Sequence, residues 1–162
     1  MRFTRSRLTW SVLVALLALF SQGGKACGYI PKSTYDKAVQ TARAFGISHN
    51  LFIALIWVES RFCENARGRA GEVGLGQVLP TTARSMGIPP HYLSNPDWNL
   101  YASAKYLRLM YERFRNWERA LIAYNAGPGR VNDPPASSRR YARNVLYVYE
   151  YLEKAERIRA RR

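Results

Sequence analysis

Histidine and cysteine are scarce in this chain of 162 residues, which contains only two of each. His49, His91, Cys27 and Cys63 do not stand at the close spacing that zinc sites in proteins use. We therefore expect no metal site. A thiol enzyme that pairs Cys63 with one of the histidines is also disfavoured, because no nucleophile motif surrounds that cysteine.

Acidic residues are few as well: 11 Asp and Glu stand against 25 Lys and Arg, so the formal net charge is +14. An excess of positive charge implies an anionic partner surface. The chain lacks zinc-finger and RNP-type motifs and any regular basic stripe with interleaved aromatic residues, so we expect no nucleic-acid partner. Much of the charge lies in the last helix and tail, which is typical of a solvated terminus. A cell-wall polymer or a membrane surface fits the remaining charge better.

The apolar stretch near the N-terminus, about residues 8–20, is short for a membrane-spanning helix, which needs roughly 20 residues. It follows three arginines and precedes small residues that suit cleavage after Ala26. This layout is typical of a secretory signal peptide. We predict a signal peptide over residues 1–26 and an exported domain over residues 27–162, periplasmic or secreted. A retained anchor and a lipidated Cys27 are the alternatives, although Gly24 and Lys25 make a poor lipidation box.

The exported part suits a single domain. Removal of residues 1–26 would take four basic residues and no acidic one, which leaves 136 residues with a net charge of +10. That length supports one hydrophobic core. Two cysteines in an exported chain predict one disulfide, between Cys27 and Cys63. The competing hypothesis is a lipidated Cys27 with Cys63 as a buried free thiol.

Apolar periodicity predicts helices joined by short loops, with no internal repeat. Residues 63–79 hold four glycines and little periodicity, so we expect a loop or short strands there. The predicted class is therefore mainly α, with a small irregular or β segment at 64–79. The expected helix N-caps are Ser33, Ser48 or Asn50, Asn95, Asn116, and Ser137 or Ser138.

Glu59 stands in an unusual setting, directly after the apolar run of residues 51–58. Such a run predicts a helix buried on most of its surface. A carboxylate there is costly to desolvate, and retention of its proton raises its pKa. A carboxylic acid still protonated near neutral pH can protonate the leaving oxygen of a glycosidic bond. The alternative is a structural glutamate paired to an arginine, such as Arg61 or Arg67.

Three motifs stand in a fixed order along the chain, and the first of them contains this glutamate. Residues 59–62 read Glu-Ser-Arg-Phe, residues 74–83 read Gly-Leu-Gly-Gln-Val-Leu-Pro-Thr-Thr-Ala, and residues 123–127 read Ala-Tyr-Asn-Ala-Gly. Their order and spacing resemble the family 1 lytic transglycosylases, the goose-lysozyme-like SLT domain that cleaves bacterial peptidoglycan. The resemblance covers about residues 35–155 and implies an α+β lysozyme-like fold.

The resemblance implies that Glu59 is the single catalytic acid and base, with no metal or organic cofactor. It also implies a set of residues that line the sugar cleft or contact the substrate. These are Ser60, Gly74, Gln77, Tyr124, Asn125 and Tyr141. The expected partner is the peptidoglycan glycan strand, and the product is a 1,6-anhydro-muramic sugar. We expect a monomer.

The chain departs from the family pattern at three positions. Gly76 replaces the usual methionine, Gly68 replaces a serine expected after the catalytic helix, and Ser137 replaces an acidic residue.

Glu64 and Glu72 are the plausible second carboxylates, so a goose-type muramidase that hydrolyses the same bond is one alternative. A non-catalytic wall-binding module of the same fold is another. Stand-alone wall turnover and association with a secretion, conjugation or pilus machine both stay open.

Overall fold

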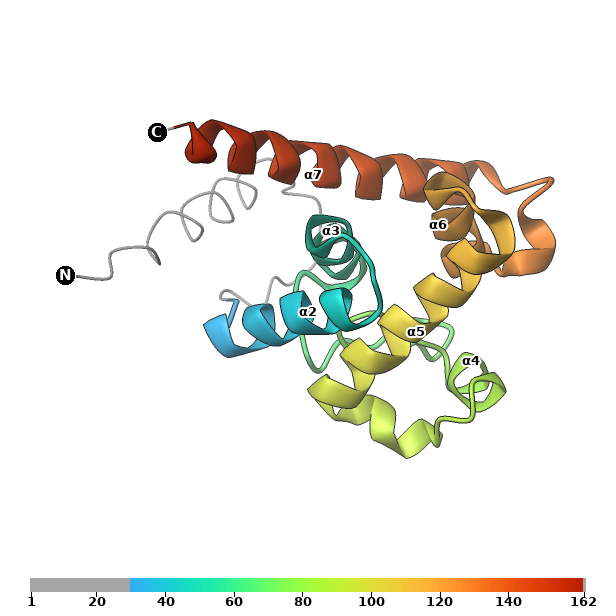
Figure 1. The fold of residues 1–162 in the computed structure, drawn as a ribbon. Coiled ribbons are helices and arrows are strands. Elements are labelled where there is room, and N and C mark those ends of the chain that lie inside the picture. The colour runs from blue at the N-terminus through green and yellow to red at the C-terminus, as the bar shows by residue number, and fades with distance from the viewer. Residues whose placement is uncertain (1–29, 162) are drawn as a thin grey trace.

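The computed structural model describes residues 30–161, and Figure 1 shows them as a bundle of helices of unequal length. The predicted signal peptide, residues 1–26, and Cys27 lie outside the described residues. No helix among residues 30–161 has the length and apolar character needed to cross a membrane. The helical elements are α2 (Lys32–Ala44), α3 (His49–Ser60), α4 (Pro80–Ser85), η1 (Pro90–Ser94), α5 (Pro96–Phe114), α6 (Trp117–Ala126), η2 (Pro128–Arg130) and α7 (Ala136–Ala160).

Helix α3 forms the centre of the fold. All residues from Asn50 to Trp57 are buried, so this helix has no polar face, in agreement with its apolar sequence. It packs against α2 on one side and against the long α7 on the other, while α5 packs against α2 and α6. The core surrounds the helix that carries Glu59, and Glu59 lies in its last turn, where the burial ends.

The prediction of a mainly α class is confirmed, and the small segment after α3 is irregular, with two isolated antiparallel bridges. Asn95 and Asn116 cap α5 and α6 as expected, because each side-chain oxygen accepts hydrogen bonds from backbone N–H groups in the first turn. The predicted caps Ser33, Ser137 and Ser138 are wrong. Their helices begin earlier, directly after Pro31 and Pro135, and the serines lie inside the first turn.

The buried side chain of Asn99, on α5, holds the loop between α3 and α4. Its Oδ1 accepts a hydrogen bond from the backbone N–H of Gly76 at 2.9 Å, and its Nδ2 donates to the carbonyl oxygens of Val73 and Leu93. A Cβ at Gly74, where φ is +74°, would lie 2.4 Å from that Nδ2. The close approach therefore requires glycine, and it places the loop against the end of α3.

Candidate active site

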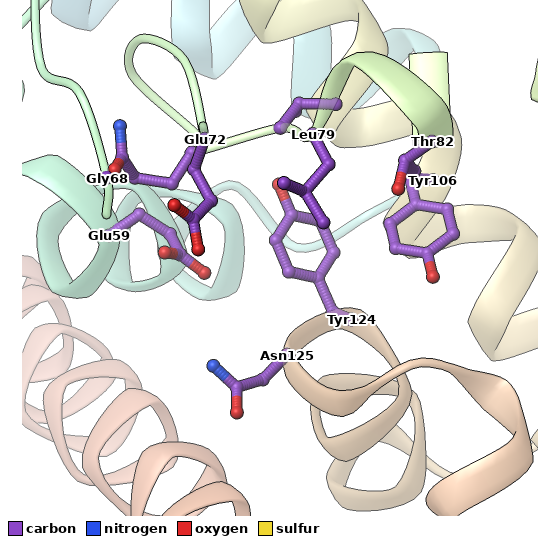
Figure 2. Close-up of a pocket in the computed structure, with 10 residues that line it drawn as sticks. Glu59, Gly68, Glu72, Leu79, Thr82, Tyr106, Tyr124 and Asn125 are labelled. Atoms are coloured by element: carbon purple, nitrogen blue, oxygen red, sulfur yellow. The ribbon is translucent and has the colours of Figure 1, made fainter. Parts of the chain in front are cut away.

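Glu59 opens onto a pocket of about 180 Å³ between α3, the loop that follows it, α4, α5 and α6 (Figure 2). Its carboxyl group projects from the last turn of α3 into this space. The lining residues come from segments far apart in the sequence. They are Glu59, Gly68, Glu72, Gln77, Val78, Leu79, Thr82, Tyr106, Tyr124 and Asn125.

Burial raises the pKa of Glu59 from 4.5 to about 7. Desolvation of the carboxylate is the largest cause, a hydrogen bond from Tyr141 opposes it, and the negative charge of Glu72 raises the pKa further. A carboxyl group with this pKa keeps its proton for a substantial part of the time at neutral pH. It can therefore give that proton to a leaving group and take one back.

Tyr141, on α7, contacts Glu59 where α7 packs against α3. Its hydroxyl donates a hydrogen bond to Glu59 Oε1 at 2.5 Å. Burial, together with the charge of Glu59, raises the pKa of Tyr141 well above its ordinary value, so the hydroxyl stays a neutral donor. Arg67, one of the arginines considered as a partner for Glu59, instead donates to the carbonyl oxygen of Ala66 and to Ser94.

Tyr124 lines the pocket, and its hydroxyl is bonded to the loop rather than to Glu59. It donates to the carbonyl oxygen of Gly76 at 2.7 Å. A Cβ at Gly76 would lie 1.9 Å from Ser103 Oγ and 2.9 Å from the Tyr124 hydroxyl oxygen. The methionine that the family pattern has here would collide with both side chains. Ser103 and Tyr124 therefore occupy the space that this departure from the pattern leaves.

Gln77, in the loop after α3, and Asn125, in α6, both line the pocket. Gln77 adopts a left-handed backbone with φ of +47°, and its Nε2 donates to the carbonyl oxygen of Gly74 at 2.8 Å. Such a conformation is uncommon for a residue with a side chain. Asn125 is exposed at the end of α6, and Figure 2 shows its amide below the Glu59 carboxyl group. Both side chains offer a donor and an acceptor to a polar ligand.

Three of the predicted substrate-binding residues are not among the pocket's lining residues: Tyr141, which contacts Glu59 instead, and the pair Ser60 and Gly74. Ser60 Oγ donates to the carbonyl oxygen of Leu75 at 2.7 Å, which ties the end of α3 to the following loop. Gly74 is packed against Asn99 behind that loop. Both residues shape the wall that carries Gln77. We infer that they position the site and do not contact a ligand in this pocket.

The two candidate second carboxylates have different positions. Glu64 accepts a hydrogen bond from Thr34 Oγ1 at 2.6 Å and is not part of the pocket lining, whereas Glu72 is. Four further lining residues were not predicted as site residues: Tyr106, and also Val78, Leu79 and Thr82, which stand within the motif of residues 74–83. Tyr106 stands at helical spacing in α5 like an ordinary core residue, so no local signal distinguishes it.

Residues 30–161 contain no group of three or more His, Cys, Asp or Glu side chains placed to hold a metal ion. The expected absence of a metal site stays a prediction. No free cysteine occurs in this part of the chain. The expected partner of Cys63, Cys27, lies outside the described residues, so the pairing stays a prediction.

Comparison with known proteins gives a consistent result. Residues 37–146 match the family described as the transglycosylase SLT domain. The chain is 32% identical over 136 residues to the peptidoglycan transglycosylase gp16 of Escherichia phage T7, which covers 72% of this chain and 10% of the phage protein. It is 29% identical over 148 residues to the soluble lytic murein transglycosylase of Salmonella typhimurium, which covers 75% of this chain and 23% of that protein.

A similar structure is that of an inactive mutant of the lytic transglycosylase Slt from Pseudomonas aeruginosa. The TM-score is 0.67 at 31% sequence identity, with 78% of this chain and 25% of the other covered. The chain therefore spans a quarter or less of the length of each of these relatives.

Proposed function

The chain belongs to the transglycosylase SLT domain family, and from that premise we propose that it is an exported peptidoglycan lytic transglycosylase. It cleaves the β-1,4 bond between N-acetylmuramic acid and N-acetylglucosamine. The observation that carries the proposal is Glu59, a largely buried acid at the wall of a pocket, with a pKa of about 7 and a hydrogen bond from Tyr141. The SLT family match and the names of the relatives supply the substrate class.

In the first step, the proton of Glu59 passes to the glycosidic oxygen as the bond from that oxygen to C1 of the muramic sugar breaks. The electron pair leaves with the oxygen. The acetamide oxygen of the same sugar bonds to C1, which gives a cationic five-membered ring. Glu59 must be protonated for this step, so cleavage should fall as the pH rises through about 7.

In the second step, Glu59 acts as the base. The 6-hydroxyl oxygen of the muramic sugar attacks C1, the bond between C1 and the acetamide oxygen breaks, and the hydroxyl proton returns to the Glu59 carboxylate. The product carries a 1,6-anhydro ring, and no water is consumed. A side chain with a pKa near 7 serves both steps, because its protonated and ionised forms are similar in free energy.

Other residues of the pocket supply contacts to the glycan. Gln77 and Asn125 can bind sugar hydroxyl and acetamide groups, while Tyr124 and Tyr106 present ring surface. The net charge of the whole chain, +14, favours an anionic wall polymer. We place the protein in the cell envelope after cleavage near Ala26, with Cys27 and Cys63 joined, either in wall turnover or beside a secretion, conjugation or pilus machine.

One observation favours a second function. Glu72 lines the same pocket as Glu59, and a second carboxylate is what a hydrolase would use to activate water. The two functions differ in product mass, because hydrolysis adds one water and the transglycosylase reaction adds none. Mass spectrometry of muropeptides that the exported domain releases from purified peptidoglycan tests the proposal. Anhydro products are expected, and hydrated products alone would refute it.

A further inference from the structure

The turn after α3 places one acidic side chain over a glycine. The backbone N–H of Gly68 donates to the carbonyl oxygen of Glu72 at 2.9 Å, and Glu72 Oε2 accepts from the N–H of Ala70 at 2.9 Å. The first bond closes the turn through the backbone, and the second holds the Glu72 side chain back across that turn. Figure 2 shows its carboxyl group pointing into the pocket toward that of Glu59.

Gly68 admits this side chain because it has no Cβ. A Cβ at position 68 would lie 2.0 Å from Glu72 Oε2 and 2.6 Å from Glu72 Cδ. Any other residue at position 68 must therefore displace the Glu72 carboxyl group. The φ of Gly68 does not lie in the left-handed region, so its backbone does not itself demand glycine. Glycine at position 68 is therefore needed to keep the Glu72 carboxyl group in this place, and is not required by the backbone of the turn.

We propose that Glu72 is a second catalytic carboxylate of the transglycosylase reaction, which stabilises the positive charge on the muramic sugar, and that Gly68 is the residue that admits it. This inference rests on the proposed function. Glu72 forms no covalent bond and transfers no proton. It stays anionic beside the sugar during both steps, first while the acetamide oxygen bonds to C1 and then while the 6-hydroxyl oxygen replaces the acetamide oxygen at C1.

Two physical effects support this role. A fixed negative charge in a partly desolvated pocket lowers the free energy of a nearby cation more than it would in water. The same charge raises the pKa of Glu59, after desolvation, so that Glu59 holds its proton until the substrate is bound. Glu64 cannot share these effects to the same degree, because it is bonded to Thr34 outside the pocket lining.

The test compares Glu72→Gln with the matched control Glu64→Gln. Glutamine keeps the shape of the side chain and its acceptor for the Ala70 N–H, and removes only the charge. We expect Glu72→Gln to lower the cleavage rate roughly 10- to 100-fold, with products still anhydro, and to move the alkaline limb of the pH profile to lower pH. The carbon-13 NMR titration of the Glu59 carboxyl should shift in the same direction. Glu64→Gln should leave all three readouts unchanged.

Gly68→Ala provides a second, independent variant. It should move the alkaline limb as Glu72→Gln does, because the methyl group displaces the Glu72 carboxylate. Added to Glu72→Gln, it should cause no further shift, since the charge is already gone. If Glu72→Gln cleaved at the wild-type rate and its Glu59 titrated as in the wild type, the proposal for Glu72 would be overturned. The proposed function would stand as long as the wild-type protein released anhydro products. Hydrated wild-type products would overturn both, because Glu72 would then activate water.

Discussion

The hydroxyl of Tyr141 donates a hydrogen bond to Oε1 of Glu59, although 82 positions separate the two residues in the chain. The contact joins the last turn of α3 to the second turn of α7 and so depends on the packing of these two helices. The hydrogen bond favours the ionised form of Glu59, whereas desolvation and the charge of Glu72 favour the protonated form. The balance of these effects holds the pKa of Glu59 near neutrality.

Substitution Tyr141→Phe tests this balance. Loss of the hydroxyl removes the effect that lowers the pKa of Glu59, so the alkaline limb of the pH profile should move to higher pH, opposite to the shift expected for Glu72→Gln. The free energy of unfolding should fall by about 1 kcal/mol, since the ring remains in place. A pH profile identical to that of the wild type would show that the hydroxyl does not tune Glu59.

Substitution Glu59→Gln should abolish wall cleavage while the protein stays folded. Glutamine can still accept the Tyr141 hydrogen bond but has no proton to give, and general acid and base catalysis contributes roughly 10²- to 10⁴-fold to the rate. Turbidity loss of purified peptidoglycan measures the rate, and circular dichroism checks the fold. Near-normal cleavage in this variant would remove Glu59 from the mechanism.

The same variant should alter how stability depends on pH. Because folding raises the pKa of Glu59 from 4.5 to about 7, the folded state binds its proton more tightly than the unfolded state. The resulting stabilisation is complete below pH 4.5 and is lost as the pH rises to about 7. The free energy of unfolding of Glu59→Gln, taken relative to that of the wild type, should therefore increase by on the order of 2–3 kcal/mol as the pH rises from the lower limit to the upper one. Urea unfolding below pH 4.5 and above pH 7 measures this gain, and equal gains at both would contradict it.

Residues of the pocket wall should separate into two groups. Gln77→Ala and Asn125→Ala should weaken cleavage with little change in melting temperature, because neither side chain is fully buried. Tyr124→Phe should instead cost about 1 kcal/mol of stability, because it leaves the carbonyl oxygen of Gly76 without the buried hydroxyl that bonds it. Thermal melts and cleavage rates on the same preparations distinguish the groups. Full activity in all three variants would mean that the motif has a structural role alone.

We predict a disulfide between Cys27 and Cys63 in the protein after the export that we propose. It would close a loop of about 35 residues and stabilise the fold by roughly 3–4 kcal/mol in the chain-entropy view. It would also brace the segment that follows α3, whose last turn carries Glu59. Thiol counting on denatured, unreduced protein should find no free thiol. Two free thiols, or a lipid-sized mass on the N-terminal peptide, would exclude the bond.

Local interactions explain the parts of the fold that the sequence predicted. The apolar run of residues 51–58 specifies a buried helix by composition alone, and Asn95 and Asn116 cap their helices through bonds to residues two or three positions away. The failed caps at Ser33, Ser137 and Ser138 also have a local cause, in residues only two or three positions away. There the prolines, at positions 31 and 135, begin the helix before the serine can.

The sequence by itself determined that one glutamate, Glu59, lies in the last turn of a helix with no polar face. Desolvation there is the largest cause of its raised pKa. Only the tertiary structure decided that Glu72, and not Glu64, shares its pocket. Both acids stand in an irregular loop whose path follows from distant contacts: the Asn99 side chain of α5 and the Tyr124 hydroxyl of α6. No periodic pattern encodes such a path, because each of these bonds joins residues more than 20 positions apart.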